Sequence, residues 1–233
     1  MSDLYLLVSE GPSDIAILKA VAGKLSAMND RDIEIRELSP ARDQTTNRYP
    51  RHGWKEVKSW CIANGDATPP ANSIMANALA KLKKNWKALV AISKAKGLII
   101  QLDTDIAHHL KINGSHGQPG DRAHCHAAIL SWLGLTIVPQ ELYFLLPSFS
   151  TENWILATHS EDESIFDIYP KPLNYECISD PCTLMTTAGY ALKGDGSISK
   201  DYELYSTYGQ KICANMVDVR TRCLEFDAFC NYL

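Results

Sequence analysis

Two short apolar runs, Leu4–Val8 and Leu98–Leu102, are the sequence feature that most limits the folds open to this chain. Runs of this kind are typical of buried strands in a parallel α/β sheet. Helix signals lie near them: Pro12 opens a helical apolar pattern that continues to Leu25, and Arg122–Leu133 predicts a further helix. The sequence therefore predicts an α/β fold with a mostly parallel central sheet flanked by helices.

The rest of the chain is interpreted from the same signals. Residues 1–160 are predicted to form the α/β core, and residues 161–233 a mainly helical C-terminal extension packed on it, in a single compact domain overall. Further strands are expected at Ile33–Leu38, Leu135–Pro139 and Tyr143–Leu146. Helices are expected at Ser73–Lys96, at Thr151–Ala157 with Thr151 as cap, and over Tyr202–Leu233, where Phe226 and Phe229 would pack back onto the body. A loop is expected at Ser39–Gly53, an irregular stretch from there through Pro70, and turns at Ser179–Gly196.

Composition excludes several classes of protein. The chain has 45% hydrophobic residues and a formal net charge of −4, which argues against disorder and gives no overall attraction for nucleic acid. No uncharged apolar run approaches the roughly 18 residues of a membrane span. The seven cysteines form no CxxC pair, which favours a reducing, cytoplasmic location. Binding of a polyanion would therefore need a local basic patch or metal ions.

Carboxylates follow both apolar runs directly. Glu10 lies on a Gly turn after the first run, and Asp103 and Asp105 follow the second. If the two strands are neighbours, these acids converge beyond their carboxyl ends, where open parallel sheets bind ligands. Three close carboxylates repel one another unless a cation intervenes, and hard oxygen ligands favour Mg²⁺ or Mn²⁺ over zinc. Alternatively, Glu10 caps its helix and the Asp pair is a solvated turn.

These motifs resemble the Toprim fold, which topoisomerases, primases and OLD-type nucleases share. Its marks are a strand followed by Glu-Gly, matched by Glu10-Gly11 with Asp14, and a later strand followed by Asp-x-Asp, matched by Asp103-Thr104-Asp105. Two further segments are similar to RloB-like and related Toprim proteins of bacterial antiphage systems: Leu146–Leu156, which contains Glu152, and the ending Cys223-Leu224-Glu225-Phe226-Asp227-Ala228-Phe229.

The resemblance implies a metal-dependent nuclease that hydrolyses phosphodiester bonds in DNA or RNA with Mg²⁺ or Mn²⁺. Glu10, Asp103 and Asp105 would be catalytic metal ligands, Asp14 a further metal ligand and Glu152 a further catalytic residue. Such a protein would be the toxic effector of an antiphage defence system. No P-loop motif occurs in the chain, so nucleotide-driven control would come from an ATPase partner. The sequence leaves the oligomeric state open, a homo-oligomer included.

Basic residues provide candidate contacts to nucleic acid. A lysine-rich stretch from Lys81 to Lys96 could follow a phosphate backbone, and the polar loop before Trp54 could reach substrate; both could equally be solvated surface. The OLD-type resemblance also implies a late lysine at the active site, for which spacing cannot choose between two candidates. The residues selected are Lys84, Lys87, Arg48 and Arg51, with Lys193 and Lys211 as the late lysines.

Other interpretations stay open. Five histidines follow the Asp pair between His108 and His126, and they could contact phosphate, move a proton or form a polar surface loop. Structural zinc is disfavoured, because neighbouring residues of a helix diverge. The chain could also be a Toprim-derived module that binds nucleic acid or a phage product without catalysis. An Asp-x-Asp phosphatase with Asp103 as nucleophile is a third reading, which leaves Glu10 unexplained.

Overall fold

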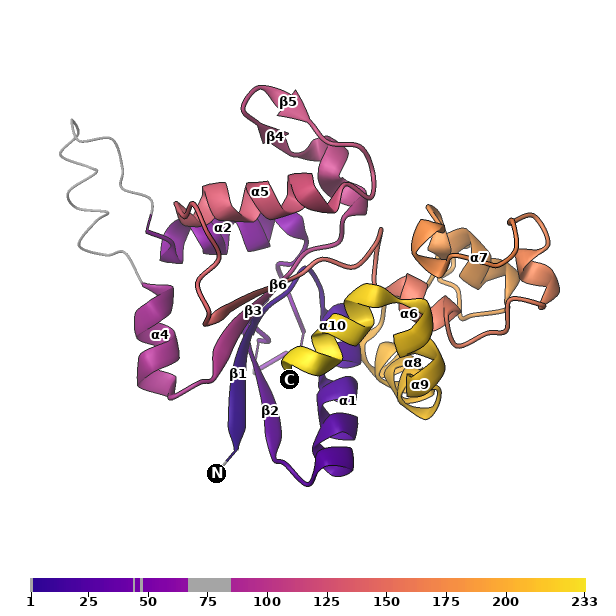
Figure 1. Cartoon of the computed structure of the whole chain (residues 1–233), viewed down its shortest axis with the longest axis horizontal. Helices are drawn as coiled ribbons and strands as arrows, with labels where there is room; N and C mark the ends of the chain where they lie inside the picture. Colours follow the sequence, from indigo (N-terminus) through magenta and orange to yellow (C-terminus); the bar gives the residue numbers. More distant parts are fainter. Residues whose placement is uncertain (1, 44, 47, 67–84) are drawn as a thin grey trace.

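The computed structural model describes residues 2–43, 45–46, 48–66 and 85–233. Within these residues, four parallel strands form a central sheet in the order β2–β1–β3–β6 (Figure 1). In its register Val8 lies opposite Ile100, so the chain leaves β1 and β3 at adjacent points of one sheet edge. The strands span Asp3–Val8 for β1, Ile33–Ser39 for β2, Gly97–Gln101 for β3 and Leu142–Leu145 for β6.

One face of the sheet is covered by α2, α4 and α5. Figure 1 shows α2 and α5 side by side, and their residues contact each other. Leu4, Leu6 and Val8 of β1 belong to the hydrophobic core on this face. Because side chains alternate along a strand, Tyr5 and Leu7 join the core of the other face. The three helices span Trp54–Asn64, Trp86–Ser93 and Arg122–Leu133.

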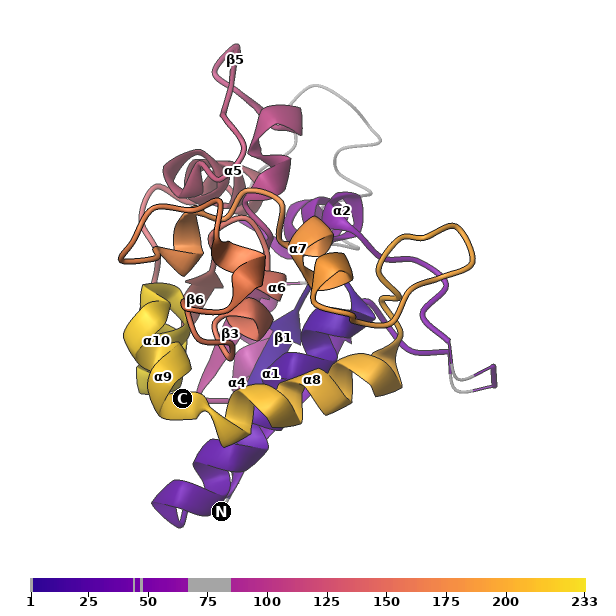
Figure 2. The same cartoon turned by 90° about the vertical axis from the view of Figure 1, so that its right-hand side faces the viewer.

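The other face is covered by α1, α6 and the C-terminal helices. Figure 2 shows α8 lying across α1, and the two helices meet at Gly209, where an added Cβ would lie 2.7 Å from the Cβ of Ala20. This close approach depends on the missing side chain. Tyr205 lies one turn earlier on α8 and interacts electrostatically with Asp14 at the start of α1. The helices span Pro12–Asn29 for α1, Glu152–Leu156 for α6, Tyr202–Ala214 for α8, Met216–Arg222 for α9 and Leu224–Tyr232 for α10.

The prediction of a parallel α/β sheet flanked by helices, with a helical C-terminal region, is confirmed. Phe226 and Phe229 pack back onto the body as expected: their ring centroids lie 5.2 and 6.4 Å from that of Trp154. Residues of α8, α9 and α10 belong to the same hydrophobic core as α1 and α6. The C-terminal region therefore shares the core of the α/β part.

Several element predictions need correction. The stretch after Gly53 is not irregular throughout, because α2 forms there with Val57, Cys61 and Asn64 buried at helical spacing. No strand forms at 135–139: Gly134 ends α5 with a positive φ of 70°, and the following residues connect α5 to β6. Of the helix expected at Ser73–Lys96, residues 73–84 lie outside the described part, and α4 ends at Ser93.

The C-terminal elements also differ in detail from the prediction. The segment predicted as one helical stretch from Tyr202 is divided into three helices, with breaks at Asn215 and Cys223. The turn-rich segment contains the helix α7, Pro181–Thr187, which Asp180 caps through its side chain. These breaks let the chain fold back so that α9 and α10 contact each other.

Candidate functional site

Glu10 and Asp14 lie where β1 passes into α1. The turn is shaped by Gly11, which precedes Pro12 at the first helical position. A Cβ on Gly11 would lie 3.3 Å from the Asp14 Oδ2 atom, so a side chain at this position would crowd the carboxylate. Asp14 is 4% exposed, and its Oδ1 accepts a 2.7 Å hydrogen bond from the Thr151 hydroxyl.

Asp103 and Glu10 are joined directly across the two strand ends. The backbone N–H of Asp103 donates to Glu10 Oε2 at 2.9 Å. Asp103 is 8% exposed, and its Oδ1 accepts a 2.8 Å hydrogen bond from the Gln101 amide. The ends of β1 and β3 therefore bring Glu10 and Asp103 into contact.

The middle residue of the Asp-x-Asp motif holds the turn in place. The Thr104 hydroxyl donates to the Pro147 carbonyl and accepts from the Phe149 N–H, both at 2.8 Å. The backbone N–H of Asp105 donates to the Phe149 carbonyl at 3.0 Å. The segment that leads from β6 into α6 thus fixes the backbone that carries Asp103 and Asp105, of which Asp105 is exposed to solvent.

Glu152 lies at the start of α6 and is 1% exposed. Its Oε1 accepts a 2.7 Å hydrogen bond from the Tyr205 hydroxyl and forms a 2.8 Å ion pair with Lys200 Nζ. The other oxygen, Oε2, is buried with no hydrogen-bond partner among the described residues. Thr151 occupies the N-cap position as predicted, but its hydroxyl bonds Asp14 and does not cap the helix.

These carboxylates interact electrostatically as one group, which we call the acidic cluster: Glu10, Asp14, Asp103, Asp105 and Glu152. Burial and the charges of Asp14 and Asp105 raise the pKa of Glu10 to about 8. Burial and the Glu152 charge raise the pKa of Asp14 to about 6. Burial and the neighbouring carboxylates also raise the pKa of Asp103 well above its usual value.

Lys200 compensates part of this negative charge. Burial alone would raise the pKa of Glu152, but the pKa is lowered, first by the charge and hydrogen bond of Lys200 and further by side-chain hydrogen bonds such as that of Tyr205. In return, Glu152 and Asp103 raise the pKa of Lys200 against the effect of desolvation. The Lys200 side chain is 45% exposed, so its ammonium reaches the cluster from the solvent side. Five carboxylates with one lysine leave the cluster with an excess of acidic groups.

The donor set of the acidic cluster suits a hard divalent cation. All its side-chain donors are carboxylate oxygens, as Mg²⁺ and Mn²⁺ prefer, and Glu152 Oε2 is a buried acceptor with no partner among the described residues. As the side chains lie, no three His, Cys, Asp or Glu residues of the described chain converge on one point that could hold a metal. Metal binding therefore requires the carboxylates to turn from their present hydrogen-bonded positions.

The predicted basic residues lie at different places. The loop that carries Arg48 and Arg51 ends beside the acidic cluster, because the Gly53 N–H donates to the Glu10 carbonyl at 2.5 Å. Both arginines are exposed. Lys87 forms an ion pair with Asp66 at 2.8 Å. No contact described for Lys87 joins it to the cluster, and Lys84 lies outside the described residues.

Neither predicted late lysine contacts the acidic cluster in the described structure. Lys211 Nζ lies 2.7 Å from the Tyr190 hydroxyl and 2.8 Å from His159 Nε2. Lys193 is exposed in a turn, where its N–H donates to the Ser197 carbonyl. A different late lysine, Lys200, contacts the cluster through Glu152. Sequence reasoning missed it because a lysine just before a helix carries no periodic signal.

Histidines near Asp105 make mainly structural contacts. His108 Nδ1 bonds the Asp105 carbonyl at 2.8 Å, and His116 Nδ1 bonds the His108 carbonyl at 2.9 Å. His124 Nε2 bonds the Leu110 carbonyl at 2.9 Å. Because a carbonyl only accepts, these ring nitrogens carry the protons. The bonds fasten the hairpin of β4 (Lys111–Ile112) and β5 (Ser115–His116) over the start of α5.

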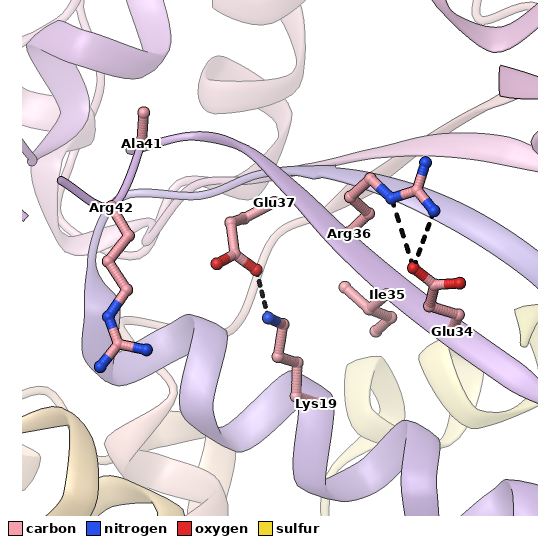
Figure 3. Close-up of a pocket in the computed structure, with 7 residues that line it drawn as sticks. All are labelled: Lys19, Glu34, Ile35, Arg36, Glu37, Ala41 and Arg42. Carbon is pink, nitrogen blue, oxygen red and sulfur yellow. Dashed lines mark hydrogen bonds and ion pairs between the residues drawn. The ribbon is translucent and has the colours of Figure 1, made fainter. Parts of the chain in front are cut away.

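A surface hollow of about 570 Å³ lies away from the acidic cluster, at the edge strand β2 (Figure 3). Its charged walls are largely self-paired: Lys19 contacts Glu37, and Arg36 contacts Glu34 at 3.0 Å. The hollow therefore offers little unsatisfied charge to a ligand. It is lined by Lys19, Glu34, Ile35, Arg36, Glu37, Ala41 and Arg42.

Comparison of the chain with protein-family models, with curated proteins and with solved structures found no match. In the described part of the chain, no helix has both the length and the apolar character needed to cross a membrane.

Proposed function

We propose that this protein is a metal-dependent nuclease of the Toprim class, which hydrolyses phosphodiester bonds in DNA or RNA. The observation that carries the proposal is the gathering of five carboxylates and Lys200 beyond the ends of β1 and β3. Raised pKa values at Glu10, Asp14 and Asp103 mean that their ionised forms destabilise the fold. Strongly perturbed groups gathered at a sheet edge are typical of functional sites.

In this proposal Glu10, Asp103 and Asp105 hold Mg²⁺ or Mn²⁺, with Asp14 as a further ligand. The bound ion would supply a Lewis acid that activates water and offsets charge on the phosphate. Lys200 holds a positive charge at the solvent side of the cluster, where it can bind a phosphate oxygen. Glu152 and Tyr205 orient that lysine through their shared contacts at Glu152 Oε1.

A cleavage assay on DNA and on RNA with Mn²⁺ tests the proposal. Wild-type protein is expected to cleave one of them, and Asp103→Asn to reduce the rate at least about 100-fold, because it removes a charged ligand. Asp30→Asn is the matched control: Asp30 is exposed at the end of α1 with a φ of 50°, which Asn tolerates. Equal cleavage by folded Asp103→Asn would contradict the assignment.

The basic loop is expected to bind the nucleic acid backbone. Arg48→Ala and Arg51→Ala should each weaken polynucleotide binding and lower the slope of log affinity against log salt by about 1, the effect of one lost phosphate contact. Fluorescence anisotropy over a KCl series measures the slope. Arg36→Ala is the control, since Arg36 is exposed on β2 and paired with Glu34. Unchanged slopes for both loop variants would show that this loop does not contact the nucleic acid backbone.

Control by an ATPase partner in antiphage defence is part of the proposal, since the chain itself has no P-loop. One observation favours a second candidate, a Toprim-derived binding module without catalysis: the carboxylates bond protein groups and do not converge as a metal site. Thermal unfolding with added Mn²⁺ separates the two. A metal-binding enzyme gains stability with concentration, whereas a module without a metal site does not.

A further inference from the structure

The strand β2 forms one edge of the sheet in the described part of the chain, where β1 is its neighbour on one side only. The Asp3 N–H donates to the Asp32 carbonyl at 2.6 Å, and β1 and β2 pair in parallel from there. Because backbone groups point to alternate sides along a strand, those of Glu34 and Arg36 face β1, and those of Ile35 face away from the sheet. Outward-facing backbone groups at a sheet edge can pair with a further strand.

The surface hollow of about 570 Å³ lies along this same edge (Figure 3). Four of its lining residues, 34–37, are consecutive in β2, and the others come from α1 and from the segment just after the strand. The charged side chains around the hollow are largely paired with one another, so they offer little to a charged ligand. An added strand would bond the backbone of β2 instead, and the hollow provides space beside that backbone.

The charges of β2 are arranged symmetrically about Ile35. Glu34 precedes it and Arg36 follows it, with side chains 47% and 51% exposed on the same face of the strand. If two β2 strands pair antiparallel about a two-fold axis at Ile35, Glu34 of each copy lies opposite Arg36 of the other. Opposite charges that face each other across two strands stabilise the pairing. Glu37 points to the other face, where it is paired with Lys19 of α1.

We propose that this edge is a homodimer interface, in which the β2 strands of two copies pair antiparallel about Ile35 and join the two sheets into one. Charged residues on an edge strand often serve the opposite purpose and keep other strands away. Charges of one sign would repel a second copy, whereas a two-fold axis brings Glu34 and Arg36 together. The surface is therefore complementary to itself. This inference is independent of the proposed nuclease activity.

Analytical ultracentrifugation of the full chain over a concentration series tests the inference. The wild type is expected to move toward twice the mass of one chain as its concentration rises. Glu34→Arg places arginine opposite arginine twice in each dimer, and Arg36→Glu does the same with glutamate, so each should raise the dissociation constant about 10- to 100-fold. The double variant Glu34→Arg/Arg36→Glu restores both pairs and should dimerise like the wild type. Glu141→Arg is the matched control, exposed just before β6 at the opposite edge, and should also dimerise normally.

A wild type that stays monomeric at every concentration would overturn the inference and show that these charges protect the edge. A dimer that both single variants leave unchanged, or that the double variant fails to restore, would equally overturn this pairing. Hydrogen exchange on the wild type provides a second measurement if a variant fails to fold. The Ile35 N–H should exchange more slowly as concentration rises, because it becomes bonded to the other copy. Exchange at Ile35 that is independent of concentration would contradict the pairing.

Discussion

Glu10→Gln is expected to make the metal-free protein more stable at alkaline pH while abolishing its Mn²⁺-dependent cleavage. The pKa of Glu10 rises to about 8 because burial and the charges of Asp14 and Asp105 oppose ionisation. In the unfolded chain the same carboxyl titrates near its usual value of 4.5. Between these pH values the folded state binds more protons than the unfolded state, so the free energy of unfolding falls as pH rises.

Urea unfolding with EDTA measures this effect. Relative to wild type, Glu10→Gln should gain up to about 4 kcal/mol at pH 8.5, and the gain should shrink toward zero as pH falls to the unfolded pKa. Glu34→Gln, at an exposed position of β2, should show no such pH-dependent gain. A variant no more stable than wild type at pH 8.5 would mean that the Glu10 carboxylate is compensated in the fold. If Glu10→Gln still cleaves nucleic acid, Glu10 is not a catalytic residue.

Lys200→Met should destabilise the protein and abolish cleavage. It leaves Glu152, which is 1% exposed, without its cation, and the Tyr205 hydroxyl alone cannot compensate a buried charge. Removing one partner of a fully buried ion pair costs 3–5 kcal/mol. Because the Lys200 side chain is 45% exposed, water screens part of the ion-pair interaction. The free energy of unfolding is therefore expected to fall by about 2 kcal/mol near neutral pH.

A double-mutant cycle measures the interaction energy between Lys200 and Glu152. Adding Glu152→Gln to Lys200→Met should recover most of the lost stability, because the unpaired charge is gone. Chemical denaturation at pH 7 gives the coupling energy. The wild-type pair holds the pKa of Glu152 low, so its contribution is present at neutral pH and is lost as pH falls through that lowered pKa. Additive effects of the two substitutions would show that the ion pair contributes nothing to stability.

The sheet edge and three of its acids were predictable because their signals are local. An apolar run predicts a buried strand, and the acids that come just after the run are thereby placed at the end of that strand. This applies to Glu10 after the first run and to Asp103 and Asp105 after the second. The same logic failed at residues 135–139, where an apolar composition resembled a strand but the chain only connects α5 to β6. The conformation of that segment follows from the turn at Gly134 and not from its hydrophobicity.

Other parts of the site depend on contacts between distant segments. Thr151 has the residue type and position of a helix cap, yet the buried Asp14 on α1 takes its hydroxyl. Lys200 precedes α8, which packs against α1 at Gly209, and its ammonium pairs with Glu152 at the start of α6. Neither spacing nor composition predicts such a pairing, since it depends on how helices far apart in the chain cross.

The order of the site along the chain has a consequence during synthesis. Glu10 leaves the ribosome before the other four acids, whereas Lys200 and Tyr205 emerge after all five. Until α8 folds onto α1, a nascent chain carries all five acids without the lysine that offsets them. The cell therefore meets a complete site only after α8 has been made.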